Sequence, residues 1–216
     1  SFNRLLWIAM IVLLAVLVWR TRDTIEAIYA GVGSLTVEEL SGGRTVVLRW
    51  RGRIQAPMEA ELSAAFARTQ DTARTYVLIL SSPGGTLDHG GRVSRLLRRI
   101  AETHELETRV EEGRRCASMC VPVFLQGERR TAAPDAAFMF HEVSFREVLA
   151  KEDAEVPQSV TTSETDKLFE TYFKPAGVPQ AWIDGVLALM KGGNDVWKTA
   201  TELVEESAGI VLEVRD

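Results

Sequence analysis

The sequence predicts an α/β domain, and two features of the chain point to this class. Residues 76–80 form a continuous apolar run with β-branched members, which suits a strand buried on both faces, as in a parallel sheet. Residues 93–100 instead carry apolar side chains at helical spacing. Similar strand and helix patterns alternate along the rest of the chain, and such alternation builds α/β domains.

The expected elements follow in chain order. A strand at residues 45–50 comes after the Ser-Gly-Gly turn at 41–43, and Pro57 opens a helix that runs to about Thr69. Beyond residue 100 we expect a strand near 108–110, a helix over 118–126, two strands on either side of 133–135, a loop to about 162, helices at 164–173, 179–190 and 201–207, and a strand at 210–214.

Length and charge limit the possible classes of protein. The chain of 216 residues suits one globular domain with a terminal extension. Its formal net charge of -5 argues against a nucleic-acid binder, because such proteins usually carry a basic surface. We expect a membrane anchor at residues 1–22, a connector at 23–44 and one folded domain at 45–216.

The anchor is expected because residues 5–19 are an unbroken apolar run. Arginines flank this run and a tryptophan lies near each end, as is typical of membrane interfaces: Arg4, Trp7, Trp19, Arg20 and Arg22. The run is shorter than the ~20 residues that usually span a bilayer, but flanking arginines can reach toward the headgroups. The competing interpretation is the apolar core of a signal peptide, although no small-x-small cleavage site follows closely. We therefore expect a single-pass membrane protein that contacts lipid through residues 5–19.

Two turns that join a strand to a helix are the candidate site. The first is the Ser-Pro-Gly-Gly sequence at 82–85, where glycines let the backbone approach a ligand and point N–H groups outward. The second, at 116–120, places Ser118 before an apolar helix, where a serine is either an N-cap or a nucleophile whose oxyanion is held by backbone N–H groups. His141 ends an apolar strand, where it is either a structural residue or a base.

Taken in order, the turn at 82–85, the Ala-Ser-Met sequence at 117–119 and His141 at a strand end resemble the Clp-type serine peptidases of the ClpP/crotonase fold. The resemblance covers residues 45–214 and implies a fold of repeated β-β-α units. The apolar N-terminus and the two cysteines are more similar to membrane-anchored periplasmic Clp-like proteins of bacteria.

The resemblance implies a role for each matching residue. Ser118 would attack the acyl carbon, and His141 would take its proton and later donate it to the leaving amine. The oxyanion hole would be formed by the backbone N–H groups of Met119 and of Gly84 or Gly85.

The resemblance also implies an acid near the C-terminal end that orients the imidazole. Asp195 matches it best, and Asp184 is the weaker candidate; either could instead cap a helix. Membrane-bound relatives often use a serine–lysine pair, but no lysine precedes Lys151, which we rank below His141 as the base.

Cys116 and Cys120 are the only cysteines, and they flank Ser118. A disulfide suits an oxidising periplasm, although a bridge over four residues needs local distortion of a helix; two buried thiols are the alternative. Our hypothesis is that a bridge rigidifies the nucleophile turn. No metal or cofactor site is expected, because His89, His104 and His141 lack metal-like spacing with these cysteines.

These features together predict a membrane-anchored serine peptidase that hydrolyses peptides or unfolded protein segments through a Ser-His-Asp triad, with its domain in the periplasm. The fold also occurs in acyl-CoA-binding enzymes without a serine nucleophile, and the pair of Ser118 and His141 argues against that activity. The second alternative is an inactive scaffold or accessory subunit of a membrane protein complex. The resemblance further implies a homo-oligomer.

Overall fold

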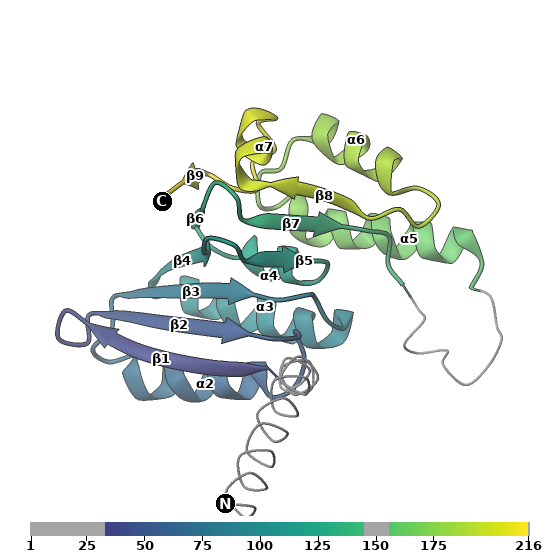
Figure 1. Cartoon of the computed structure of the whole chain (residues 1–216). Coiled ribbons are helices and arrows are strands. Elements are labelled where there is room, and N and C mark those ends of the chain that lie inside the picture. Colours follow the sequence, from purple (N-terminus) through teal and green to yellow (C-terminus); the bar gives the residue numbers. More distant parts are fainter. Residues whose placement is uncertain (1–32, 145–155, 216) are drawn as a thin grey trace, which may run out of the picture.

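A six-stranded sheet and a smaller three-stranded sheet organise the molecule, as the computed structural model shows for residues 33–144 and 156–215 (Figure 1). The strands are β1 (Ser34–Leu40), β2 (Thr45–Arg51), β3 (Thr75–Ser81), β4 (Glu105–Val110), β5 (Arg115–Ala117), β6 (Arg129–Ala132), β7 (Ala137–Phe140), β8 (Val196–Thr199) and β9 (Glu213–Val214). The helices are α2 (Met58–Thr69), α3 (Leu87–Ala101), α4 (Cys120–Phe124), α5 (Gln158–Leu168), the π-helix η1 (Phe169–Phe173), α6 (Gln180–Met190) and α7 (Ala200–Glu205).

The large sheet has the strand order β1-β2-β3-β4-β6-β9 and is parallel except for β1. The apolar run at residues 76–80 is the buried centre of β3, as predicted. Helices α2 and α3 cover one face of this sheet (Figure 1), where Leu62 and Leu97 are fully buried with Leu78 of β3. Full burial of one such side chain contributes about 1.5–3 kcal/mol.

The small sheet has the order β5-β7-β8, with β5 and β7 parallel. A bridge between Ser82 and Cys116 joins the end of β3 to β5. Because β5 and β7 run in the same direction, their carboxyl ends, followed by Ser118 and His141, lie at the same edge. This edge carries the candidate site.

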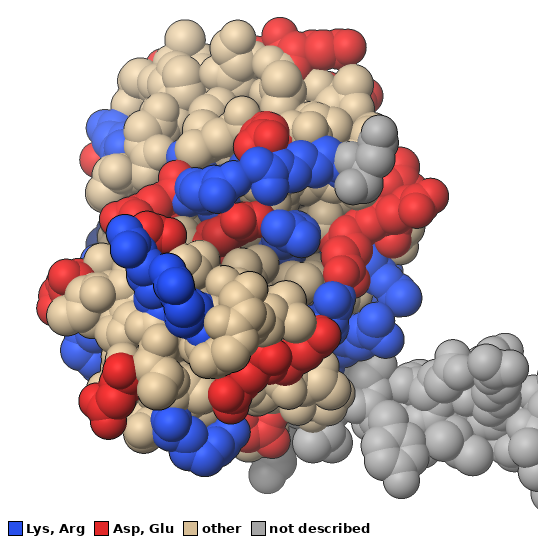
Figure 2. Space-filling model, turned by 90° about the vertical axis from the view of Figure 1, so that its left-hand side faces the viewer, with Lys and Arg blue, Asp and Glu red and all other residues tan. Residues whose placement is uncertain are grey.

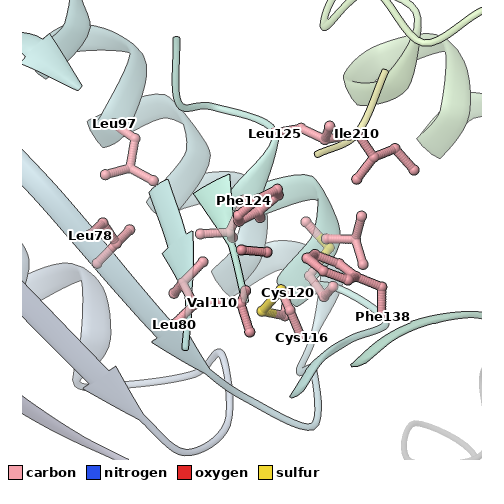
Figure 3. Packing of buried hydrophobic residues seen from close by; sticks show 14 of the residues in the cluster. Leu78, Leu80, Leu97, Val110, Cys116, Cys120, Phe124, Leu125, Phe138 and Ile210 are labelled. Carbon is pink, nitrogen blue, oxygen red and sulfur yellow. A yellow bond between two sulfur atoms is a disulfide. The ribbon is translucent and has the colours of Figure 1, made fainter. Parts of the chain in front are cut away.

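One core connects the two sheets. Figure 3 shows side chains from β3, α3, α4, β7 and the C-terminal segment packed together. Phe124 and Phe138 meet edge to face with ring centroids 5.1 Å apart, a favourable arrangement for aromatic rings. Packing on both sides therefore supports the short segment that contains Ser118.

Several elements differ from the sequence-based expectations. β1 lies in the segment predicted as a connector, because its stability comes from pairing with β2 and most of its side chains are exposed. β8 was not predicted, since four partly exposed residues become a strand only by pairing with β7. The helix expected over 118–126 is the shorter α4, because Ser118 has a φ of 53° and so cannot lie in a right-handed helix.

The predicted anchor at residues 1–22 lies outside the described residues. Within residues 33–144 and 156–215, no helix is long and apolar enough to cross a bilayer.

Candidate active site

Ser118 and His141 form the centre of the site. The Ser118 Oγ and His141 Nε2 atoms are 2.7 Å apart, a hydrogen-bond distance. Ser118 follows β5 with a φ of 53°, in the left-handed region that few non-glycine residues adopt. Its N–H donates to the Met139 carbonyl at 2.8 Å, which holds the turn against β7.

Ser118 is not an N-cap. Met119 precedes the first residue of α4, and no side chain caps this helix. The Ser118 carbonyl accepts from the Val121 N–H at 2.9 Å, while the hydroxyl is directed to the imidazole. The N-cap interpretation of this serine is therefore wrong.

The hydrogen bonds of His141 assign the tautomer of its ring. Nδ1 lies 2.5 Å from the Glu142 backbone carbonyl, and a carbonyl oxygen can only accept. Nδ1 of the neutral ring therefore carries the proton, and Nε2 is the acceptor for the Ser118 hydroxyl. This is the proton arrangement that a general base needs.

The glycine turn at 82–85 lies directly against the nucleophile. Gly84 has a φ of +105°, and a Cβ there would lie 2.7 Å from the Ser118 Cβ. A Cβ on Gly85 would lie 2.0 Å from the Ile54 carbonyl oxygen. Only residues without a side chain fit at these two positions.

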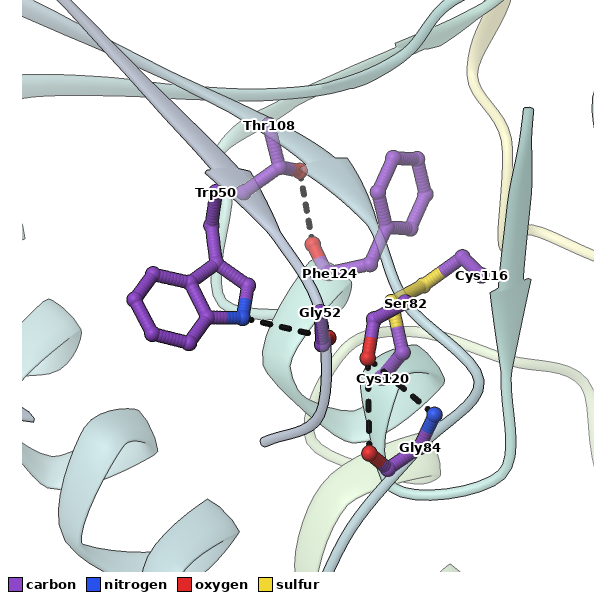
Figure 4. The surroundings of a disulfide bond; sticks show 8 residues. All are labelled: Trp50, Gly52, Ser82, Gly84, Thr108, Cys116, Cys120 and Phe124. Carbon is purple, nitrogen blue, oxygen red and sulfur yellow. Dashed lines mark hydrogen bonds between the residues drawn. A yellow bond between two sulfur atoms is a disulfide. The ribbon is translucent and has the colours of Figure 1, made fainter. Parts of the chain in front are cut away.

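The backbone donors of this turn have different partners. The Gly84 N–H donates to the Ser82 Oγ at 3.1 Å (Figure 4). Within residues 33–144 and 156–215, the N–H groups of Gly85 and Met119 donate no hydrogen bond. Both residues line the same cavity as Ser118. These two N–H groups are thus available to an oxyanion, and the structure favours Gly85 over Gly84 as the donor from this turn.

The predicted acids do not contact His141. Phe140 pairs with Val196, so the next residues, His141 and Asp195, leave the β7–β8 ladder together. The Asp195 side chain is nevertheless exposed and makes no hydrogen bond or ion pair with any residue that the structure describes. Asp184 accepts from the Gln180 side chain at 2.7 Å within α6. Lys151 lies outside the described residues.

The two cysteines are joined by a disulfide, with Cα atoms 5.1 Å apart (Figure 4). Cys116 belongs to β5 and Cys120 begins α4, so the bridge spans the turn that contains Ser118 rather than one helical turn. Both cysteines are fully buried. The need for distortion within a helix therefore does not arise.

A cavity of about 470 Å³ opens beside the serine. Its volume is that of a typical small-molecule or side-chain site. Much of its lining is apolar and comes from α3, the Ser118 turn, α4, β7, α5 and η1: Leu87, Met119, Pro122, Phe140, Leu168 and Phe173. The sequence pattern predicts a helix at residues 164–173 but carries no sign that this helix lines the site.

His89 lies outside the pair. Its Nδ1 contacts the Thr86 Oγ1 at 2.8 Å, at the first turn of α3. In the part of the chain that the structure describes, no group of three His, Cys, Asp or Glu residues is placed to hold a metal ion.

Comparisons with known proteins show which known fold this architecture is similar to. No family model matches the sequence, and no curated protein matches it. Among solved structures, a point mutant of ClpP1 from Listeria monocytogenes is similar, with a TM-score of 0.58 and 16% sequence identity. The match covers 81% of this chain and 92% of that one. The fold is ClpP-like. This result confirms the predicted α/β class and the resemblance in fold; at 16% identity the likeness concerns the ClpP-like fold alone.

Proposed function

We propose that this chain is a Clp-type serine hydrolase that cleaves peptide bonds. The observation that carries the proposal is the Ser118–His141 contact of 2.7 Å in the tautomer a base requires, beside two backbone N–H groups that donate to none of the described residues. A histidine with a purely structural role, or a serine that only caps a helix, would not need this combination of a serine–histidine contact and these N–H groups. The ClpP-like fold supports the same activity as an analogy.

The geometry accounts for each step of acyl transfer. Ser118 Oγ attacks the peptide carbonyl carbon while its proton moves to His141 Nε2. The developing oxyanion would accept from the N–H groups of Gly85 and Met119, each such donor being worth about 10²–10³ in kcat. The C–N bond then breaks, His141 protonates the leaving amine, and water hydrolyses the acyl-serine by the reverse proton path.

The apolar cavity favours a peptide with an apolar side chain next to the scissile bond, because the cavity wall offers Met119, Phe140 and Phe173.

On the face drawn in Figure 2, basic and acidic residues are interleaved rather than gathered into one basic surface. We propose peptides or unfolded segments as the substrate class. A membrane anchor, a periplasmic location and assembly into a homo-oligomer belong to the same proposal.

A second candidate is an inactive scaffold or accessory subunit of a membrane complex. The observation that favours it is the exposed Asp195 without contact to His141. The Ser-His-Asp triad implied by the resemblance therefore lacks its third contact, and the pair of Ser118 and His141 carries the proposal.

The deciding experiment is labelling of the full chain in detergent with a fluorophosphonate probe. We expect the wild type to react, Ser118→Ala to be inert, and His141→Ala to react slower by about 10³-fold or more. Ser63→Ala, which removes an exposed serine of α2, should react like the wild type. A folded wild type that does not react would favour the scaffold.

A further inference from the structure

Glu142 contacts three parts of the site at once. Its backbone carbonyl accepts from His141 Nδ1. Its carboxylate accepts from the Gly193 N–H at 3.0 Å and from the Gln158 side chain at 2.9 Å. One residue therefore links the imidazole to the first turn of α5 and to the turn between α6 and β8.

The Nδ1 partner matters because it selects the tautomer and the orientation of a catalytic imidazole. In a Ser-His-Asp triad this partner is a carboxylate. Here the acceptor is a carbonyl one residue along the chain, and Asp195 is exposed although it leaves the ladder opposite His141.

The Glu142 carboxylate also contacts the turn between α6 and β8. Gly192 and Gly193 both have positive φ, +85° and +83°, and none of the described residues would contact a Cβ at either position. Within the turn, the N–H groups of Gly193 and Asn194 donate to the Met190 carbonyl at 3.1 Å. The hydrogen bond from the Gly193 N–H to Glu142 ties this turn to the strand end that carries His141, two residues before Asp195.

We propose that Glu142 is the positioning residue of His141: its carbonyl orients the imidazole, its carboxylate holds that carbonyl in place, and Asp195 is dispensable. This inference rests on the proposed nucleophile–base pair. It differs from the Ser-His-Asp arrangement in the group that holds Nδ1.

The first test reads the tautomer directly and needs no activity. The chain has three histidines, so the ring nitrogens of His141 can be assigned by the resonances lost in His141→Ala. In ¹⁵N-histidine-labelled wild type at a pH where the ring is neutral, we expect protonated Nδ1 and unprotonated Nε2. In Glu142→Ala the ring should move toward the Nε2–H form. A wild-type ring protonated at Nε2, or no change in Glu142→Ala, would overturn the proposal.

The second test compares rates of fluorophosphonate labelling. Asp195→Asn should stay within about threefold of the wild type, whereas loss of an orienting acid in a triad costs about 10⁴. Glu142→Ala should lose about tenfold, as for one lost hydrogen bond. Glu142→Gln keeps one acceptor oxygen and should lie between, which also covers the case that the alanine variant does not fold.

Glu164→Ala is the matched control, because its carboxylate pairs only with Lys167 on α5 among the described residues. It should label like the wild type. A loss in Asp195→Asn as large as that in Glu142→Ala would overturn the proposal. If the wild type does not label at all, the proposed function fails, and the ring-nitrogen measurement still decides whether Glu142 holds His141.

Discussion

At the scale of single residues, the site depends on two backbone conformations. Ser118 has a φ of 53°, a strained conformation for a residue with a side chain. Gly84, with a φ of +105°, lies so close that its missing side chain makes room for the serine. The two turns can meet only because one of them has no Cβ at the contact.

Gly84→Ala should therefore displace the nucleophile. The added Cβ would lie 2.7 Å from the Ser118 Cβ and 2.9 Å from the Ala117 carbonyl oxygen, so the serine turn must shift. We expect fluorophosphonate labelling to slow by about 100-fold, the cost of a misplacement of about 1 Å. Gly113→Ala is the control, since its φ is +62° but no atom of the described residues lies within 4 Å of an added Cβ. Equal labelling rates for the two variants would contradict this account.

At the scale of elements, the disulfide joins β5 to α4 on either side of the nucleophile. Cys116 is held in β5 by pairing with Phe138, and Cys120 begins a helix of five residues. A helix this short has little stability of its own. The covalent bridge and the surrounding core are what keep it in register with the strand.

Replacing both Cys116 and Cys120 by alanine should lower the free energy of unfolding by about 2 kcal/mol, from loss of a short closed loop. We expect labelling of Ser118 to slow as well, because the turn between the two positions is freed. Denaturant unfolding and probe kinetics measure the two effects. Mass spectrometry after alkylation without reductant is the control; two alkylated thiols in the wild type would disprove the bridge.

At the scale of the whole molecule, Arg130 connects the sheet to the C-terminal segments. Its guanidinium is buried and donates to the backbone carbonyls of Gly127, Ala176, Gly209 and Ile210. Burial lowers the pKa of this arginine. No carboxylate pairs with it among the described residues, so the charge is satisfied by carbonyl dipoles alone.

Arg130→Met should destabilise the protein by about 3 kcal/mol, because four carbonyls lose their donor inside the molecule. Its neighbour Arg129 has a side chain that is 59% exposed and ion pairs of 3.9 and 4.0 Å, so Arg129→Ala should cost less than about 1 kcal/mol. Thermal unfolding of the two variants checks the difference. Similar melting temperatures would show that Arg130 does not join these segments.

Much of the architecture was readable from local patterns. The apolar run at 76–80 is β3, and the helical spacing at 93–100 falls in α3, because burial on both faces or on one stripe leaves a clear period in the sequence. β1 and β8 were missed for the opposite reason. They are short or exposed strands whose stability comes from pairing with a neighbour, and pairing leaves no such period.

By itself, the sequence determined the α/β class, the two strand-to-helix turns and the chemical types of the candidate residues, since these depend on composition and spacing within a few neighbours. Only the tertiary structure decided how those residues meet. It placed Ser118 against His141 across 23 residues and put the Glu142 carbonyl rather than Asp195 at Nδ1. It also directed the Gly84 N–H to Ser82 and gave the Gly85 N–H no partner among the described residues. Hydrogen bonds require distances within a few tenths of an ångström, and packing between distant segments sets those distances.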